Sequence, residues 1–558
     1  MNKNKTKLGT LGRWSWFVFL LLTVFGYLVS GLSNRDVPAR RANAAAANDP
    51  ESGDADPISK SVAKVNQAWR DHIKAKGLAH ADQADWMTIC RRQSLALVGS
   101  QLSLEEIREL EKRPESERVD RHLNQLLGDP RFHDYWAERW ARFLVGTDSG
   151  QFVVFRRRRF TSWLSTAFKE DWRYDRLVKR LVAAEGLWTD KPEVNFLTAT
   201  FDSNDNAADP MRLAARTARC FLGLRIDCLQ CHNDFLGNVN LGDINNLREG
   251  QQTDFHQLAA FYTSAKTNGF RGVTSGEVDY KYKYLDDDEE TDVAADVPYQ
   301  SELLGTEADP RKRLANWITH PENRQAARAA VSHIWALMYG RPVGEAVDNL
   351  PLDEEMHPAM EVMTDDFIAN KFNIRRLIRV IANSSMFRTA SRADFEIRPE
   401  HETAGAVFPL VRLRPEQVAG SIVQASRVKS VDLDSSFIVQ LQRFGGIQDF
   451  VSRYGDMGED EFSSENVTIT QRLVMLNGKM LDEAIGYNWI LNAAAHIHMY
   501  TENDARAIET VYLCTLNRRP TQKEQTLFQT RLSQGNRKKA IEDLYWILLN
   551  STEFAWGH

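Results

Sequence analysis

Apolar residues recur at the spacing of a helix along most of this 558-residue chain, and this repeat restricts its fold more than any other feature. One predicted helix ends at Gly340, because Pro342 follows soon after. The apolar face of that helix is made of Ala327, Val331, Ile334, Trp335 and Met338. The same spacing recurs at Ile374, Leu377, Ile378 and Ile381, and again at Ala540, Ile541, Leu544, Ile547 and Leu548.

The starts of helices are also marked in the sequence. Ser103 and Glu106 have the spacing of a capping box, and so do Thr521 and Glu524. Alternating strand patterns are scarce, and 152–155 is the one short candidate. We therefore predict an all-α fold.

The N-terminus predicts the cellular compartment. Residues 14–32 contain no charge and are about long enough to cross a membrane. The basic residues Lys3, Lys5, Lys7 and Arg13 precede them, so we expect the N-terminus to stay cytoplasmic. We predict one retained helix in the inner membrane, with the bulk of the chain in the periplasm. Cleavage as a signal peptide is the alternative, and 42–44 (Ala-Asn-Ala) offers a site.

The exported body is ordinary in composition, with 43% hydrophobic residues and a net charge of −6. This mild acidity gives no reason to expect a nucleic-acid partner. Five cysteines are too few for a disulfide framework in so long a chain. Cys90 and Cys514 lie among apolar neighbours, which favours buried and inert thiols, and a Cys220–Cys228 disulfide is left open.

A change in composition divides the body in two. Seven acidic residues crowd 286–296, where apolar periodicity is missing, so we predict an extended linker. A calcium loop is less favoured, because the run lacks the spacing of a known loop. The predicted organisation is a cytoplasmic tail and transmembrane anchor at 1–32, a flexible linker at 33–58, a helical domain at 59–265, an acidic linker at 266–307 and a second helical domain at 308–558.

The motif Cys228-Leu229-Gln230-Cys231-His232 carries the main chemical signal. Two thiols three positions apart can bond the vinyl groups of a c-type haem, and the adjacent imidazole can ligate its iron. We therefore predict Cys228 and Cys231 as attachment residues and His232 as the metal ligand. No sixth ligand is obvious, and His256 and Met211 are the nearest candidates. For His256 an exposed position on a helix is the plainer role, and for Met211 a core position.

Other roles for the cysteine pair stay open. A disulfide between Cys228 and Cys231 would simply stiffen a loop in an oxidising compartment. A thioredoxin-type role would need the pair at a helix N-terminus within a βαβ unit, which the pattern does not indicate. Zinc would require further ligands at metal-site spacing, and the sequence shows none.

Several longer stretches resemble a known pair of domains. The first set includes LLGDPRFHDYWAERWARFL, ARCFLGLRIDCLQCHNDF and DFHQLAAFYTSAK, and the second includes RAAVSHIWALMYGRPVGEAVDNL and LRPEQVAGSIVQASRV. They resemble exported planctomycete proteins that join a cytochrome-c-related domain of unknown function (PSCyt-type) to a planctomycete domain of unknown function (PSD-type). The resemblance implies a haem at Cys228, Cys231 and His232. Relatives commonly continue the motif with Asp-His-Pro or Asp-His-Lys, whereas this chain has Asn233-Asp234-Phe235, so any metal role of that second histidine is lost.

A run of four arginines at 156–159 could pair with haem propionates or anionic lipids, but a solvated helix surface is the plainer interpretation. No nucleophile–base motif is present, so the sequence names no reaction. We expect a c-type haem protein acting in electron transfer or redox sensing at the cell envelope, with a redox or binding partner that the sequence does not identify. The alternative is a haem-free binding or scaffolding protein of the envelope, linked to polysaccharide handling, and a hydrolase with unrecognised carboxylates is a third hypothesis.

Overall fold

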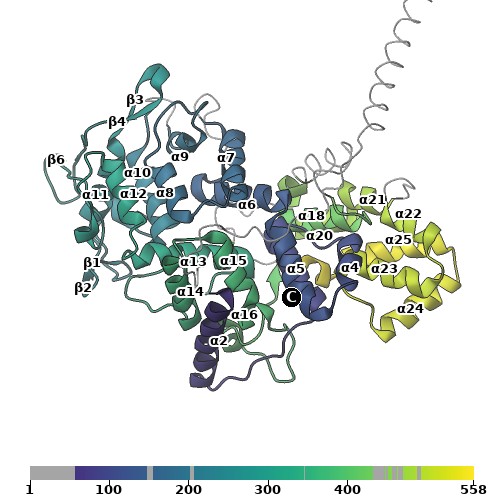
Figure 1. Cartoon of the computed structure of the whole chain (residues 1–558). Coiled ribbons are helices and arrows are strands. Elements are labelled where there is room, and N and C mark those ends of the chain that lie inside the picture. The colour runs from purple at the N-terminus through teal and green to yellow at the C-terminus, as the bar shows by residue number, and fades with distance from the viewer. Residues whose placement is uncertain are drawn as a thin grey trace, which may run out of the picture. The chain divides into compact units, whose positions relative to one another are not determined.

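Short helices build most of the protein in a computed structural model (Figure 1). The structure describes residues 57–147, 155–201, 207–344, 346–431, 447, 450–454, 462, 469–486 and 492–557. The prediction of a helical protein is confirmed, although short strands accompany the helices. The predicted anchor at 14–32, nearly all of the linker at 33–58 and the strand candidate at 152–154 lie outside these residues. Among the helices that are described, none has the length and apolar character that a membrane crossing requires.

The first half of the chain contributes ten α-helices and several shorter turns to the described structure. The α-helices are α2 (Ile58–Ala75), α3 (Trp86–Val98), α4 (Leu104–Glu111), α5 (Glu115–Leu127), α6 (Pro130–Val145), α7 (Arg157–Lys169), α8 (Tyr174–Val182), α9 (Asn195–Thr198), α10 (Pro210–Thr217) and α11 (Gln252–Thr263). The 3₁₀ turns are η1 (Pro192–Val194), η3 (Asp227–Gln230), η4 (Gly269–Arg271) and η5 (Ser301–Leu303), and a π-helical turn, η2 (Ala218–Leu222), continues α10.

The second half is also helical where the structure describes it. Its helices are α12 (Pro310–Ile318), α13 (Arg324–Tyr339), α14 (Pro358–Ala369), α15 (Ile374–Asn383), α16 (Ser385–Arg388), α17 (Pro399–Thr403), α18 (Pro415–Ala425), α20 (Ile469–Asn477), α21 (Lys479–Ile485), α22 (Ala493–Tyr500), α23 (Asp504–Leu516), α24 (Gln522–Ser533), α25 (Arg537–Leu549) and α26 (Thr552–Ala555).

The strands form four antiparallel pairs of two to four residues each. The pairs are β1 (Asn240–Asp243) with β2 (Asn246–Glu249), β3 (Ala265–Thr267) with β4 (Val273–Ser275), β5 (Lys281–Tyr282) with β6 (Thr291–Asp292), and β7 (Val411–Arg412) with β8 (Trp556–Gly557). None of the pairs builds a core of its own, so the fold remains a helical one.

The helix-start signals predicted from sequence are confirmed. The Ser103 hydroxyl accepts a bond from the Glu106 backbone N–H at 3.0 Å, and the Glu106 carboxylate accepts one from the Ser103 N–H at 2.8 Å. Thr521 and Glu524 make the same reciprocal pair at the start of α24. Such caps stabilise a helix because its first N–H groups have no partner within the helix.

The predicted apolar faces are buried, with one exception. In α13 all five predicted residues lie in the core, and Gly340 ends the helix with a φ of +89°. The four residues of α15 are buried as well. In α25, however, Ile547 is 39% exposed while Leu544 and Leu548 are buried. The stripe of α25 is therefore narrower than the sequence predicted.

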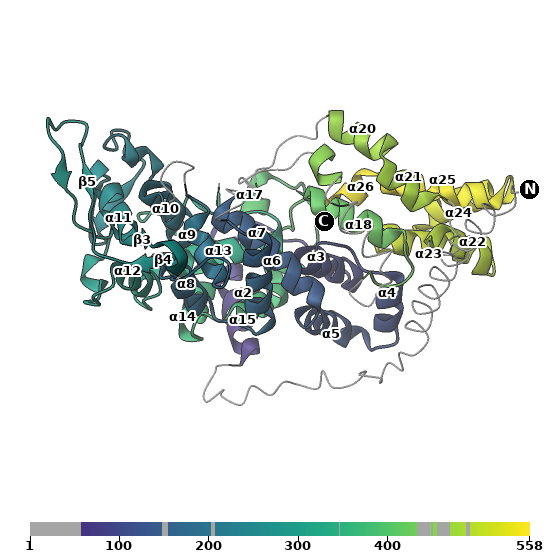
Figure 2. The same ribbon diagram turned by 90° about the horizontal axis from the view of Figure 1, so that it is seen from above.

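Two hydrophobic cores hold the described residues together, and they divide the chain at a place that the sequence did not predict. The larger core takes nearly all of its residues from 65–408, and the smaller one takes nearly all of its residues from 413–554. Figure 2 shows the elements of the smaller core, α18 and α20 to α26, gathered together. Helices from both predicted domains share the larger core, since α13 packs against α3, η2 and α14.

The predicted acidic linker is built into the larger core. Val273, Val297 and Tyr299 from 266–307 are buried in it, and β3 and β4 form a hairpin within the same stretch. The acidic side chains at 286–290 are exposed, as charge repulsion predicts, while the apolar residues around them anchor the segment. The cores therefore do not separate at this stretch.

Candidate functional site

The Cys228–His232 motif lies on a short 3₁₀ turn, η3, which a single buried side chain attaches to the core. Leu229 is fully buried, whereas Cys228, Cys231 and His232 are exposed. Both cysteines are free thiols in the structure. All three predicted site residues are thus presented on one surface loop.

The Gln230 carbonyl, between the two cysteines, is the main anchor of this loop. It accepts hydrogen bonds from Gln252 Nε2 at 3.1 Å, from the Tyr282 hydroxyl at 3.3 Å and from His256 Nε2 at 3.1 Å. After the motif, the Asp234 carboxylate accepts bonds from the N–H groups of Leu236 and Val239. The loop is therefore held by bonds on both sides of His232.

The orientation of His232 follows from its hydrogen bond. Its Nδ1 lies 2.6 Å from the carbonyl oxygen of Asn233. Because a carbonyl can only accept, Nδ1 donates to it, and in the neutral ring Nε2 then keeps its lone pair. An imidazole held in this way is prepared to bind a metal through Nε2.

His256 lies in a different environment from the one predicted. The sequence indicated an exposed helical position, but the side chain is fully buried. Its ring packs against those of Tyr280, Tyr282 and Tyr284, with 3.5 Å between the His256 and Tyr282 centroids. Since Nε2 donates its N–H to the Gln230 carbonyl, Nδ1 accepts a hydrogen bond from the Tyr280 hydroxyl at 2.8 Å. With both nitrogens engaged, His256 has no lone pair for a metal.

The three tyrosines were missed at the level of sequence, although a signal was present. They alternate with lysines in the stretch Tyr280-Lys281-Tyr282-Lys283-Tyr284, and this period of two is typical of a strand. The ladder formed here is only two residues long, so the pattern is brief. The Tyr280–Tyr284 stretch nevertheless connects the predicted linker to the motif loop.

Met211, the other candidate sixth ligand, also lies beside the loop. Its sulfur accepts a hydrogen bond from Gln230 Nε2 at 3.4 Å, and its side chain packs on the larger core. Both candidates therefore contact Gln230 and support the loop from within. Neither presents a free ligand atom beside His232.

The thiols of the chain differ in their surroundings. Partial burial, and then the charge of Asp234, raise the pKa of Cys228 above its ordinary value. Thiol–disulfide catalysts need a lowered pKa, so this environment does not favour that chemistry. Cys90, Cys220 and Cys514 are buried, and burial raises the pKa of Cys514 to about 11. Cys220 donates to the Phe143 carbonyl, and no Cys220–Cys228 disulfide is present.

The residues of the loop fit the attachment of a c-type haem in their donor set. Covalent attachment requires two accessible thiols, and ligation of the iron requires an imidazole that donates through Nδ1 and leaves Nε2 for the metal. The loop offers these groups. Phe235 and Leu236 follow the motif with exposed fractions of 72% and 82%, and their apolar surfaces could cover part of a porphyrin. His256 and Met211 do not fit the sixth position.

Other metal sites are not indicated by the part of the chain that the structure describes. Within it, no group of three or more histidine, cysteine, aspartate or glutamate side chains is placed to hold an ion. This holds for the described acidic residues at 286–296 and for the Cys228–His232 loop.

The arginine run at 156–159 connects loops around the start of α7. The Arg157 guanidinium donates to the Gly146 carbonyl at 2.7 Å and to Glu138 at 2.9 Å. Arg159 donates to the Thr189 carbonyl, and Arg158 is exposed. The solvated-surface interpretation therefore describes only part of the run. Glu138 also pairs with Arg142 at 3.6 Å.

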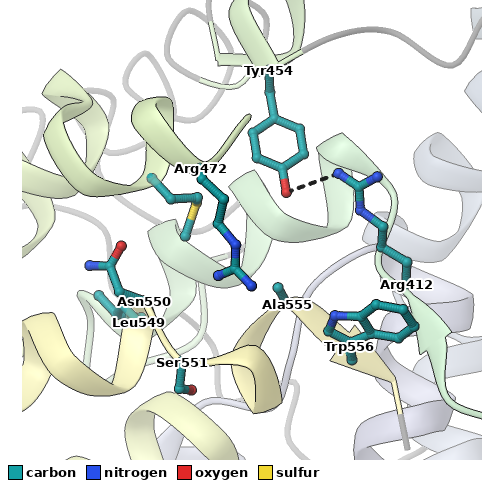
Figure 3. Close-up of a pocket in the computed structure, with 9 residues that line it drawn as sticks. Arg412, Tyr454, Arg472, Leu549, Asn550, Ser551, Ala555 and Trp556 are labelled. Atoms are coloured by element: carbon teal, nitrogen blue, oxygen red, sulfur yellow. Dashed lines mark hydrogen bonds between the residues drawn. The ribbon is translucent and has the colours of Figure 1, made fainter. Parts of the chain in front are cut away.

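Figure 3 shows a pocket elsewhere in the protein, beside the β7–β8 pair. Arg412 and Arg472 point into it, and the Arg412 guanidinium lies 3.5 Å from the Tyr454 hydroxyl. Its space of about 10 Å³ accommodates one water molecule at most. This pocket is too small for an organic cofactor.

Comparison with known protein families agrees with the resemblance seen in the sequence. Residues 64–267 match the family PSCyt2, described as a protein of unknown function (DUF1549), and residues 310–444 match PSD1, also described as a protein of unknown function (DUF1553). The chain is a PSCyt2–PSD1 protein. The motif loop and His256 both lie within its PSCyt2 region. No curated protein and no solved structure matches the chain.

Proposed function

We propose that this PSCyt2–PSD1 protein attaches a c-type haem through Cys228 and Cys231, with His232 as the proximal ligand, and acts in electron transfer or redox sensing at the cell envelope. The observation that carries the proposal is the presentation of two free thiols and an Nδ1-anchored imidazole on one exposed loop. When bound, the haem would supply a one-electron redox couple. The proposal also places the segment 14–32 in the inner membrane and the rest of the chain in the periplasm, because attachment of a c-type haem requires an exported chain.

The residues of the loop have separate tasks in this proposal. Cys228 and Cys231 would hold the haem, and His232 would offer Nε2 while its Nδ1 donates to the Asn233 carbonyl. Gln230 fixes the peptide between the thiols, because three donors converge on its carbonyl. His256 positions the loop and does not ligate.

The test is expression of the full chain with a cytochrome maturation system. We expect a Soret band and haem staining that survives a denaturing gel. The double variant Cys228→Ala/Cys231→Ala should lose both signals, while Cys220→Ala, which changes a buried thiol outside the loop, should keep them. A colourless full chain, or haem retained by the double variant, would refute attachment here. A colourless protein with an intact fold would support the scaffolding hypothesis.

A further inference from the structure

An open hollow of about 500 Å³ lies along the exposed side of α8, and every residue that lines it falls within 171–180. The opposite side of α8 is buried through Tyr174, Leu177, Val178, Leu181 and Val182. Three residues advance a helix by about 4.5 Å, so Arg173, Arg176 and Lys179 form a row of cations at that spacing. The exposed side of α8 therefore carries basic residues at intervals of three positions.

The charge of the hollow is positive. Arg180 adds a fourth cation, and the lining contains two carboxylates. Both carboxylates already have arginine partners: Asp175 pairs with Arg173 at 2.8 Å, and Asp171 lies 3.5 Å from Arg375. Asp175 therefore offsets the charge of Arg173, and Arg180 lies 3.2 Å from Glu193, so Arg176 and Lys179 are the cations that an entering anion would meet.

A tryptophan forms part of the lining beside these cations. The Arg176 guanidinium lies 3.7 Å from the ring centroid of Trp172. Trp163 packs edge-on against the same ring, with 5.7 Å between the centroids, and the indole N–H donates to Glu170 at 2.9 Å. The indole is thus held in place, with the Arg176 guanidinium over one face and the remainder of its half-buried ring beside charged donors.

We propose that this hollow binds an anionic saccharide, a chain of sugar rings that carries sulfate or carboxylate groups. Arg176 and Lys179 would pair with successive anionic groups, and a sugar ring would lie against the exposed part of Trp172. Arginine suits this role because its planar guanidinium can bond two oxygens of one oxyanion. The inference is independent of haem attachment.

Three other ligands fit the hollow less well. A single phosphate or sulfate would fill only a small part of about 500 Å³. A lipid surface is met by projecting apolar side chains, whereas the aromatic residue of this lining is half-buried. Nucleic acid is disfavoured by the net charge of −6.

The test is calorimetric titration of the detergent-solubilised full chain with a heparin hexasaccharide. We expect saturable binding that weakens as salt is raised. The variant Arg176→Ala/Lys179→Ala should lower the affinity at least tenfold. The matched control Arg121→Ala/Lys523→Ala removes two exposed cations from α5 and α24 and should change the affinity less than twofold.

Several outcomes would overturn the proposal. They are no binding of the hexasaccharide, equal loss in the control variant, and equal binding of neutral maltohexaose. Competition by inorganic sulfate at equal concentration would show a simple anion site instead. Preferential binding to phosphatidylglycerol vesicles, lost in the Arg176→Ala/Lys179→Ala variant, would make the hollow a lipid site. Circular dichroism of each variant checks that the helices are intact.

Discussion

His333 in α13 is a fully buried histidine whose two ring nitrogens have no hydrogen-bond partner. Its ring stacks on Phe143, with 3.7 Å between the centroids, and meets Trp140 edge-on at 4.9 Å. Burial, and then the positive charge of Arg414, lower the pKa of His333 from 6.5 to about 3. The imidazole is therefore neutral in the folded protein at any pH above about 3.

This shift makes the stability of the fold depend on pH. Below pH 6.5 the unfolded chain protonates His333 while the folded protein does not, so acid favours unfolding. The contribution of the neutral ring is fully present above pH 6.5 and is lost as the pH falls toward 3. Each pH unit below 6.5 is worth about 1.4 kcal/mol, and two such units lie between pH 7.5 and 4.5, so the loss over this interval is about 3 kcal/mol.

The substitution His333→Phe should remove this loss. At pH 7.5 the net effect is small, because relief of two unsatisfied nitrogens and the added bulk of phenylalanine oppose each other, each at about 1–3 kcal/mol. The packing cost is the same at both pH values. It therefore drops out when the unfolding free energies at pH 7.5 and pH 4.5 are subtracted. We expect the unfolding free energy of the variant to fall by about 3 kcal/mol less than that of the wild type over this interval.

Urea denaturation followed by circular dichroism at four pH values measures the difference. His122 and His357, whose pKa values burial lowers to about 4, remain in the variant, so some pH dependence should persist. His80→Phe, at an exposed position, should not alter the slope. If wild type and His333→Phe lose stability in parallel, the argument from burial is wrong.

Three further substitutions test the packing and the helix cap. Leu229→Ala removes the buried anchor of the motif loop and should cost about 2–5 kcal/mol of unfolding free energy, with faster alkylation of the adjacent thiols. Gly272→Ala should cost more than about 1 kcal/mol, because φ is +74° and the new Cβ would lie 2.2 Å from the Gly186 carbonyl oxygen; a neutral effect in urea would refute this geometry. Ser103→Ala breaks the capping box and should lower the unfolding free energy by about 1 kcal/mol, whereas Ser103→Asp should restore most of it.

The sequence predicted local features best, because helix caps and apolar faces depend on residues three or four positions apart. The Ser103–Glu106 box and the apolar face ending at Gly340 are of this kind. The sequence also predicted that Cys228, Cys231 and His232 share one loop, since they are neighbours in the chain. It missed the burial of His256, because the tyrosines that enclose it lie 24 to 28 positions away in a stretch dominated by charge.

The division of the cores could not be predicted for a similar reason. The acidic run at 286–296 marks a change in composition, but composition does not report which apolar residues meet in space. His333 stacks on Phe143 across that run, so the larger core is continuous between the two matched families. The pairing of β7 with β8 joins residues 411–412 to 556–557, and a two-residue ladder leaves no periodic signal.

Arg91 in α3 shows what such distant contacts require during synthesis. Its buried guanidinium donates to the carbonyls of Phe554 and Trp556, and the latter lies 465 positions further along the chain. At about 5–20 residues per second, the ribosome delivers that acceptor roughly 20–90 s after Arg91 itself. Until then the Arg91 guanidinium lacks these two acceptors. The final packing around α3 can therefore form only when synthesis of the chain is nearly complete.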